Sequence, residues 1–364
     1  MKNNTSIKEV SLILTYRCNL SCSMCLQRPP YRKEFINRFP DLMELNDWKL
    51  VIDQLVEYRK TIQYIYLTGG EPFIVPYIYD LIKYVKGKHF IVSANSNGSL
   101  LPHAIEQLLD SGVDLLILSI DGPDYIHNKI RNKKNSYSNT IQVIQHIRQR
   151  RKGIKPRIFV NCTIQEENYM VLEDYVEQLV KIGADQIFFH LQMFISQETS
   201  NKYVKQYQHL FHIAPFAQYG AIANPNIDTK ELLHILQKIK EKYSNIHMLH
   251  DLTKIDIEDY FNLPDKQFRN SHMQACHAAE NILEIAPDGS VITCHDFPDY
   301  IAGNVRNDTI RNIWNGEKIE RFRDTVRNGN LFSICHRCCM SERYAEYCNG
   351  TIKTKGAFYN EVTK

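Results

Sequence analysis

Short apolar runs alternate with amphipathic helical patterns through the first 190 residues, and few folds accommodate that alternation. The runs have the length of buried strands and begin near residues 10, 64, 90, 115, 158 and 187. Between the first two runs, Trp48, Val51, Ile52 and Leu55 recur at the spacing of one helical face. Runs that are apolar throughout are typical of a parallel sheet covered on both faces. The alternation therefore predicts the α/β class, as a βα barrel, whole or partial, or as a doubly wound sheet.

The second half of the chain has a different character. Residues 201–270 are rich in Lys, Gln and Tyr, and their apolar residues between 232 and 239 repeat at helical spacing. From residue 271 the chain is rich in loops and cysteines, and Pro287-Asp288-Gly289 between two short apolar runs indicates a β-hairpin. We therefore expect a barrel over 1–200, a helical connecting segment over 201–270 and a small loop-rich domain over 271–364.

Composition and charge exclude several kinds of partner. The 44 Lys and Arg residues nearly balance the 41 Asp and Glu residues, so neither nucleic acid nor a membrane surface is indicated. No run approaches the roughly 18 consecutive apolar residues that a membrane helix needs. Residues Met1 to Ser6 have no apolar signal-peptide core behind them, so we expect a cytoplasmic protein. In a reducing compartment, the ten cysteines are expected to bind metal or do chemistry rather than form disulfides.

A first group of cysteines follows the first predicted strand. Cys18, Cys22 and Cys25 form a C-x-x-x-C-x-x-C pattern at the strand end, which is where sites occur in βα barrels. Thiolates select iron–sulfur clusters, zinc or copper(I). A closed zinc site needs four ligands, and no fourth cysteine or histidine is near in sequence. Three thiolates on a [4Fe–4S] cluster would leave one iron open. A zinc knuckle completed by a distant residue is the alternative.

A second motif follows the second predicted strand. The sequence there is Thr68-Gly69-Gly70-Glu71-Pro72. Paired glycines at a strand end let the backbone approach a ligand closely and leave N–H groups that can bond to it. By itself such a sequence is most often an ordinary turn.

Taken together, these residues resemble the radical S-adenosylmethionine (SAM) superfamily over residues 8 to 195. The resemblance implies a partial (β/α)6 TIM-like barrel in which Cys18, Cys22 and Cys25 hold a [4Fe–4S] cluster with SAM on its open iron. It further implies SAM contacts from Met24 near the adenine, from Gly69, Gly70, Glu71 and Pro72 at the amino group, from Asn97 in an Asn-Gly turn, and from Ser119, Asp121 and Arg131 near the ribose and carboxylate.

The chemistry of that superfamily defines the expected activity. One electron, supplied by a donor such as a flavodoxin or ferredoxin, cleaves SAM into methionine and a 5′-deoxyadenosyl radical. The radical then abstracts a hydrogen atom from the substrate. The cofactors carry the difficult step, and the protein positions the partners and excludes water.

The second group of cysteines lies near the C-terminus, at positions 276, 294, 335, 338, 339 and 348. A structural zinc ribbon and an iron–sulfur cluster are equally compatible with four thiolates. This region resembles the auxiliary domains called SPASM, which usually has seven cysteines and two clusters, and twitch, which holds one. With six cysteines here, we expect one auxiliary [4Fe–4S] cluster on Cys276, Cys294, Cys335 and Cys338. Cys339 and Cys348 are left over. Either could replace Cys338, or Cys348 could begin an incomplete second site.

No catalytic residue is assigned from the sequence. Glu280, Asp296 and Asp299 are candidate bases without any special spacing. We expect an oxidoreductase or epimerase acting on a small polar metabolite, such as a sugar, aminocyclitol or amino acid in natural-product biosynthesis. The first strand begins within ten residues of Met1, which leaves no room for a domain that grips a leader peptide. A peptide maturase is the alternative, and a non-enzymatic zinc- or cluster-binding module is the alternative of another class.

Overall fold

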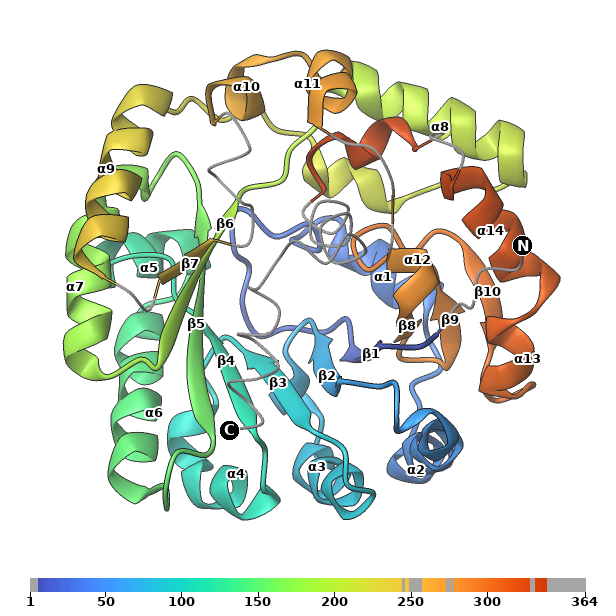
Figure 1. Ribbon diagram of the computed structural model, residues 1–364, viewed down its shortest axis with the longest axis horizontal. Helices are drawn as coiled ribbons and strands as arrows, with labels where there is room; N and C mark the ends of the chain where they lie inside the picture. Colours follow the sequence, from blue (N-terminus) through green and yellow to red (C-terminus); the bar gives the residue numbers. More distant parts are fainter. Residues whose placement is uncertain are drawn as a thin grey trace.

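The computed structural model describes residues 6–243, 246–248, 257–272, 276, 278–327 and 331–338. Within them, one sheet of ten strands runs in the order β10-β9-β8-β1-β2-β3-β4-β5-β6-β7 (Figure 1). The strands are β1 (Glu9–Thr15), β2 (Tyr64–Gly69), β3 (Val92–Ser96), β4 (Leu115–Ser119), β5 (Arg157–Ile164), β6 (Gln186–Leu191), β7 (Ile246–Met248), β8 (Ile282–Ile285), β9 (Ser290–Ile292) and β10 (Ile301–Asn304). In that order, every neighbouring pair from β8-β1 to β6-β7 is parallel, whereas the pairs β8-β9 and β9-β10 are antiparallel.

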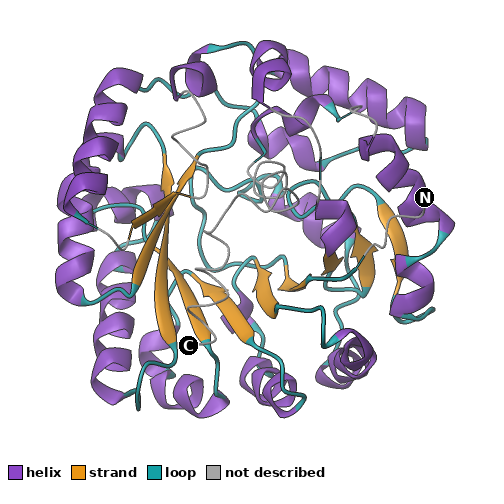
Figure 2. Cartoon of the chain, in the orientation of Figure 1, coloured by secondary structure: helices purple, strands orange, loops and turns teal. Residues whose placement is uncertain are grey.

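The helices that follow the barrel strands are α1 (Arg32–Arg38), α2 (Leu45–Leu55), α3 (Ile78–Gly87), α4 (Ile105–Ser111), α5 (Asp124–Arg131), α6 (Ser136–Arg150) and α7 (Leu172–Ile182). The later helices are α8 (Gln197–Phe211), α9 (Thr229–Lys242), α10 (Ile257–Asn262), α11 (Asp265–His272), α12 (Ala278–Asn281), α13 (Ile310–Trp314) and α14 (Glu317–Arg327). Helices α2 to α7 and α9 lie on the outer side of the curved sheet, as Figure 1 and Figure 2 show. In α2, the four apolar residues of the predicted face are all buried. Burial of such faces against the sheet stabilises this layered arrangement.

The predicted α/β class, with its parallel barrel core, is confirmed. The predicted hairpin is also present, because β8 and β9 are joined through Gly289, whose φ of 88° favours glycine. Two features differ from the expectation. A short strand, β7, lies in the segment that we expected to be helical. The hairpin strand β8 pairs with β1, so the C-terminal segment continues the barrel sheet instead of starting a separate one. The domain boundaries stay predictions.

The interior of the barrel changes character along its strands. Near their amino ends, Leu115, Ile117, Phe159 and Phe188 form a small apolar cluster of buried side chains. Alternate residues of a strand share one face. On that face, β5 continues from Phe159 with the polar residues Asn161 and Thr163. In β6, the polar residue His190 follows Phe188 on the same face. The barrel is therefore filled with apolar side chains at one end and lined by polar groups at the other.

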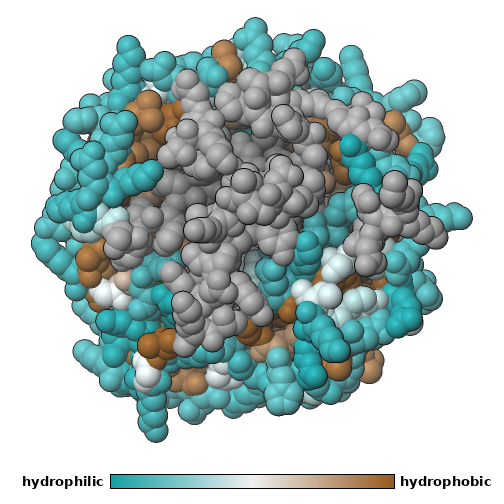
Figure 3. All heavy atoms as spheres, viewed as in Figure 1, coloured by the Kyte–Doolittle hydropathy of each residue, from teal (hydrophilic) through white to brown (hydrophobic). Residues whose placement is uncertain are grey.

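Around the edge of the view in Figure 3, the described residues form a mainly hydrophilic surface, with hydrophobic side chains in small separate groups. Scattered apolar residues of this kind are ordinary on protein surfaces. Among the described helices, none combines the length and the apolar character needed to cross a bilayer.

Candidate active site

A cavity of about 380 Å³ lies at the carboxyl ends of the parallel strands. Its walls come from the loop between β1 and α1, from the ends of β2 to β6, from the loop after β9 and from a 3-10 turn, η6 (Ser333–Arg337). The predicted site residues that line it are Cys18, Cys22, Met24, Cys25, Gly69, Gly70, Asn97, Ser119 and Arg131. The other predicted SAM contacts, Glu71, Pro72 and Asp121, lie behind this lining. The barrel thus gathers most of the predicted residues around one space.

The three thiols of the first group share one wall of the cavity. Burial raises the pKa of the Cys25 thiol to about 11 and also raises the pKa of Cys18. Both thiols are therefore protonated in the metal-free protein, and metal binding would release those protons. In the described part of the chain, no three or more His, Cys, Asp and Glu side chains converge closely enough to hold a single ion. In a cubane cluster each thiolate binds a different iron, so its ligands need not converge on one point.

Arg32, at the start of α1, fixes the shape of the cysteine loop. Its guanidinium donates to three backbone carbonyls of that loop: Nη1 to Cys18 at 3.2 Å, Nη2 to Leu20 at 2.7 Å and Nε to Gln27 at 3.1 Å. Hydrogen bonds from a charged donor are stronger than those between neutral groups. The sequence did not single out Arg32, because its partners are main-chain oxygens that leave no pattern of residue types.

The paired glycines bring the two motifs into backbone contact. A Cβ atom at Gly69 would lie 2.3 Å from the carbonyl oxygen of Thr15, and one at Gly70 would lie 2.2 Å from that of Arg17. The N–H groups of Gly70 and Glu71 donate to those carbonyls at 2.7 and 2.9 Å. The first of these bonds therefore reaches the end of β1, and the second reaches the start of the cysteine loop. Glycine is needed here because the two loops approach too closely for a side chain.

Glu71 ties the ends of two strands together behind the cavity wall. Its carboxylate accepts from the backbone N–H of Asn97 at 2.8 Å, from Ser96 Oγ at 2.9 Å and from the N–H of Phe73 at 3.2 Å. Burial raises its pKa to about 7, although these hydrogen bonds oppose the shift. Pro72 starts the following 3-10 turn, η2 (Pro72–Ile74). Glu71 therefore positions Asn97, whose Nδ2 donates to Asn19 in the cysteine loop at 2.9 Å.

Arg131 reaches the cavity from the end of α5. Its Nη2 lies 2.6 Å from Oδ2 of the fully buried Asp121, and its Nη1 lies 3.7 Å from the sulfur of Cys22. The other oxygen of Asp121 accepts from the N–H of Thr163 at 3.1 Å. His127 supports this pair, since its Nδ1 accepts from the N–H of Asp121 at 3.2 Å. Asp121 thus orients Arg131, and Arg131 is the member of the pair that lines the cavity.

Cavity residues that the sequence did not single out come from the same strand ends. Polar side chains at inward positions of β3, β5 and β6 line the space: Asn95, Asn161, Thr163, His190 and, just after β6, Gln192. A usable signal was present, because Asn161 and Thr163 alternate with apolar residues within an otherwise apolar strand.

Four cysteines of the second group lie in described parts of the chain, and all four are partly buried. Cys276 precedes α12, Cys294 follows β9, Cys335 lies in the middle of η6, and Cys338 directly follows η6. Burial raises the pKa of Cys294 and of Cys276, whereas bonds from the N–H groups of Ala279 and Ala278 act against the shift at Cys276. Cys339 and Cys348 lie outside the described residues.

Two family models match these two halves of the site. The radical SAM superfamily matches residues 12–179, and an iron–sulfur cluster-binding domain, SPASM, matches residues 276–339. The chain is a radical SAM protein with a SPASM domain. The resemblance drawn from the sequence is confirmed, and with it [4Fe–4S] clusters and SAM as the cofactors.

Several known proteins are similar to this radical SAM protein. A tungsten-containing aldehyde ferredoxin oxidoreductase cofactor-modifying protein of Pyrococcus furiosus is 24% identical over 357 residues, 92% of this chain and 88% of the relative. An AdoMet-dependent heme synthase of Nitratidesulfovibrio vulgaris is 24% identical over 350 residues, 94% of this chain and 86% of the relative.

Solved structures show the same fold. Streptococcus suis SuiB has a TM-score of 0.61 both with bound S-adenosylmethionine and with its precursor peptide SuiA, at 13% and 14% identity. The two comparisons cover 88% and 93% of this chain and 68% and 71% of SuiB. At such identity the likeness concerns the fold alone.

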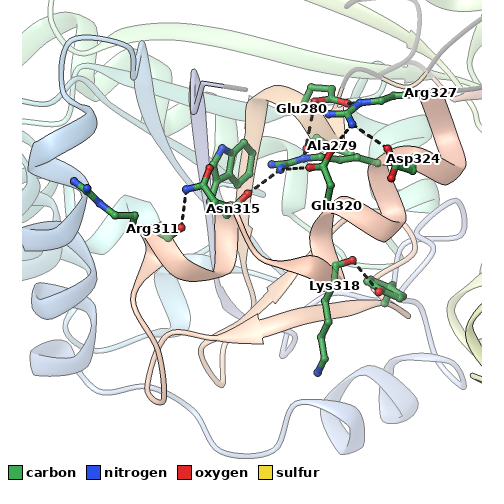
Figure 4. Close-up of polar contacts among 11 residues, drawn as sticks. Ala279, Glu280, Arg311, Asn315, Lys318, Glu320, Asp324 and Arg327 are labelled. Carbon is green, nitrogen blue, oxygen red and sulfur yellow. Dashed lines mark hydrogen bonds and ion pairs between the residues drawn. The ribbon is translucent and has the colours of Figure 1, made fainter. Parts of the chain in front are cut away.

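Within the SPASM domain, two arginines of α14 hold the turn that follows Cys276 (Figure 4). Arg323, which is 1% exposed, donates from Nε to the carbonyl of Ala279 at 2.9 Å and stacks 4.3 Å from the ring centroid of Trp314. Arg327 pairs with both carboxylate oxygens of Glu280, at 2.5 and 2.8 Å. These contacts fix α12 against α14 and so position Cys276.

The structure separates the three candidate bases. The carboxylate of Glu280 is engaged by Arg327. Asp299 is 1% exposed, and its carboxylate accepts from the backbone N–H of Phe216 at 2.6 Å and from the hydroxyl of Tyr203 at 3.1 Å. Asp296 lines the cavity together with its neighbour His295. Of these three carboxylates, Asp296 is the one that lines the cavity.

Arg337 joins the SPASM domain to the barrel. It lies between Cys335 and Cys338, lines the cavity, and stacks 4.1 Å from the ring centroid of Phe194, just after β6. Its guanidinium pairs with Asp265 and donates to the carbonyls of Tyr260 and Leu263, both at 2.7 Å. Arg337 thereby connects α10 and α11 to the segment that carries two predicted cluster ligands.

Proposed function

We propose that this radical SAM enzyme holds its catalytic [4Fe–4S] cluster on Cys18, Cys22 and Cys25 and binds a polar substrate in the adjoining cavity. The observation that carries this proposal is the shared wall, in which three thiols lie beside Gly69, Gly70, Ser119 and Arg131 around one space. When bound, the cluster and SAM together supply the one-electron chemistry that removes a hydrogen atom from a substrate. An external one-electron donor, such as a flavodoxin or ferredoxin, would complete the system.

The residues around the thiols fit a bound amino acid group such as that of SAM. Arg131 lines the cavity, and its Nε is buried without a hydrogen-bond partner in the described part of the chain. A buried donor without an acceptor is costly, so a carboxylate placed there would stabilise it. Met24 offers apolar surface on the same wall, and Asn97 and Ser119 offer polar groups. Gly69 and Gly70 line the cavity with backbone alone.

The polar lining supports a small, polar substrate. Asn95, Asn161, Thr163 and His190 are polar side chains of the lining, and such a lining suits hydroxyl, amine or amide substituents better than hydrocarbon. We infer that a sugar, aminocyclitol or amino acid in natural-product biosynthesis is bound there. Asp296 is positioned to contact that substrate from the SPASM domain.

The outcome that we favour is oxidation, with epimerisation as the alternative. We propose Cys276, Cys294, Cys335 and Cys338 as ligands of an auxiliary [4Fe–4S] cluster, and such a cluster can accept an electron from a substrate. Burial of the four thiols and the arginine contacts that support them favour a permanent site over a transient one.

A peptide substrate is the second candidate. SuiB, which shares this fold, was solved with its precursor peptide. A peptide also presents amides and hydroxyls that the same polar lining would accept. The two candidates differ in the size and protease sensitivity of the substrate, and these properties can be measured.

The first experiment tests the cluster and the reaction. The protein is reconstituted without oxygen, iron and sulfide are counted, and 5′-deoxyadenosine is assayed with SAM and dithionite. We expect about eight iron atoms per chain and deoxyadenosine formation. In Cys22→Ala, we expect about four iron atoms and no deoxyadenosine. Cys162→Ala is the matched control, because Cys162 is fully buried in β5, belongs to neither cysteine group and accepts a bond from Asn168 Nδ2 at 3.7 Å. Zinc in place of iron would overturn the proposal.

The second experiment separates the substrates. Extract from cells grown in D₂O is divided into a metabolite ultrafiltrate and a peptide fraction, and each is added to unlabelled enzyme and SAM. Deuterium in the deoxyadenosine marks the fraction that contains the substrate. We expect the metabolite ultrafiltrate to transfer deuterium to deoxyadenosine, and we expect it to do so equally after treatment with protease. Label only from the peptide fraction, lost after protease treatment, would establish the peptide candidate instead.

A further inference from the structure

A short turn between α8 and α9 touches the loops of both cysteine groups. This turn is the 3-10 element η5 (Ala217–Ala221), and the proposed reaction assigns no role to it. It is also tied to the end of β6, because the N–H of Ile195 donates to the carbonyl of Ala221 at 2.9 Å. What the turn contacts at each end shows what it can do.

At one end the turn is pressed against the first cysteine loop. Nη1 of Arg28 donates both to the carbonyl of Gly220 at 2.6 Å and to the carbonyl of Cys25 at 2.9 Å. A Cβ atom at Gly220 would lie 2.0 Å from the carbonyl oxygen of Leu26, the residue after Cys25. The approach of the two backbones therefore excludes any side chain at Gly220.

At the other end the turn is held from the SPASM domain. Asp299 lies five residues after Cys294, and its Oδ1 accepts from the N–H groups of Phe216 at 2.6 Å and Ala217 at 3.4 Å. Its Oδ2 accepts from the hydroxyl of Tyr203 in α8. Buried hydrogen bonds to a carboxylate are among the stronger ones in proteins. The start of the turn is thus fixed to the loop that follows a predicted auxiliary ligand.

We infer that residues 216–221 brace the catalytic cysteine loop against the SPASM domain. This inference rests on the proposed function, in which Cys18, Cys22 and Cys25 hold the catalytic cluster. Gly220 and Asp299 are the positioning residues of this brace. Neither touches the reacting atoms. They act by setting where Cys25 and the residue after it lie relative to the cavity.

The main test compares two glycine variants of the reconstituted holoenzyme. Gly220→Ala is expected to displace the loop, whereas Gly87→Ala is the control, because a Cβ at Gly87 meets no atom within 4 Å. The readout is the change that SAM induces in the electron paramagnetic resonance spectrum of the reduced cluster, with SAM affinity from its titration. Gly220→Ala should lose that change, and deoxyadenosine formation should fall about 100-fold, since a displacement of about 1 Å can reduce a rate by that factor. A wild-type response would overturn the brace.

Variants of Asp299 provide the second test. Asp299→Asn keeps an oxygen that can accept from the two backbone N–H groups, and Asp299→Leu does not. We expect Leu to weaken SAM binding strongly and Asn to restore most of it, with similar iron content in both. If the Leu variant lost only auxiliary iron and bound SAM normally, Asp299 would serve the SPASM domain alone and the brace would be wrong. A Leu variant that fails to fold leaves Asn and Gly220→Ala to decide.

These outcomes are separable from failure of the proposed function. If the first cysteines hold no cluster with an open iron, wild type itself shows no SAM-induced spectral change. If only the brace is wrong, wild type shows the change and Gly220→Ala shows it equally.

Discussion

The two cysteine regions are built in different ways. The first supplies three thiols from eight consecutive residues, and its loop is held by main-chain bonds to the neighbouring strand end and by Arg32. The second draws its predicted ligands from three separate segments. Arg323 holds the segment of Cys276, Arg337 holds the segment of Cys335 and Cys338, and the turn η5 contacts the loop that follows Cys294. A compact loop depends on a few local contacts, whereas a dispersed site depends on packing between distant segments. The two regions should therefore fail in different ways when their supports are removed.

Removal of Arg32 should have the largest effect, and it should be confined to the first region. Arg32→Met deletes three hydrogen bonds to loop carbonyls. We expect deoxyadenosine formation to fall by about 100-fold or more, as for other small displacements of reacting groups. Any loss of iron should not exceed the roughly four atoms of the first cluster, because the auxiliary site keeps its own. Lys33→Met, an exposed cation on the same helix, should match wild type. Equal loss of both clusters would contradict the comparison.

Removal of Arg337 should produce the opposite pattern. Arg337→Met leaves the carboxylate of Asp265 buried without its cation. Breaking one side of a buried ion pair costs about 3–5 kcal/mol, so we expect the free energy of unfolding to fall by that amount. We also expect the auxiliary iron to be lost. The SAM-induced spectral change of the first cluster should persist. The double variant with Asp265→Asn should recover part of the stability, as urea titration of all three proteins would show. No recovery would mean that Arg337 acts through stacking on Phe194.

How far the sequence predicts these features depends on the range of the contacts. The strand and helix alternation predicted the barrel, because each element carries its own periodic signal. Both cysteine groups could be found from spacing alone. The pairing of Ser11 with Glu284 across β1 and β8 could not, because residues 273 positions apart leave no periodic signal. Arg32 was missed for another reason: its partners are backbone oxygens, which any residue type offers.

The pH dependence of stability should test the support that Glu71 gives to the first region. Burial raises the pKa of Glu71 to about 7 in the folded protein, above its ordinary value in the unfolded chain. The folded state therefore binds the proton more tightly, and stability is present at low pH and lost as pH rises through 7. Compared with Glu71→Gln, wild type should lose up to about 3 kcal/mol between pH 5 and 8. Parallel urea titrations of the metal-free proteins measure this difference. A difference independent of pH would show that Glu71 stays ionised when folded.

The smallest expected effect lies in the turn that touches both regions. Gln218 is fully buried in η5, and neither atom of its side-chain amide has a hydrogen-bond partner in the described part of the chain. A buried polar group without a partner costs about 1–3 kcal/mol, so Gln218→Met should raise the free energy of unfolding of the metal-free protein by about 1 kcal/mol. The same pair should then be compared after reconstitution. If the gain persists, the amide serves neither cluster. If the gain reverses, the loaded protein supplies the missing partner, and the turn senses cofactor binding as well as bracing the loop.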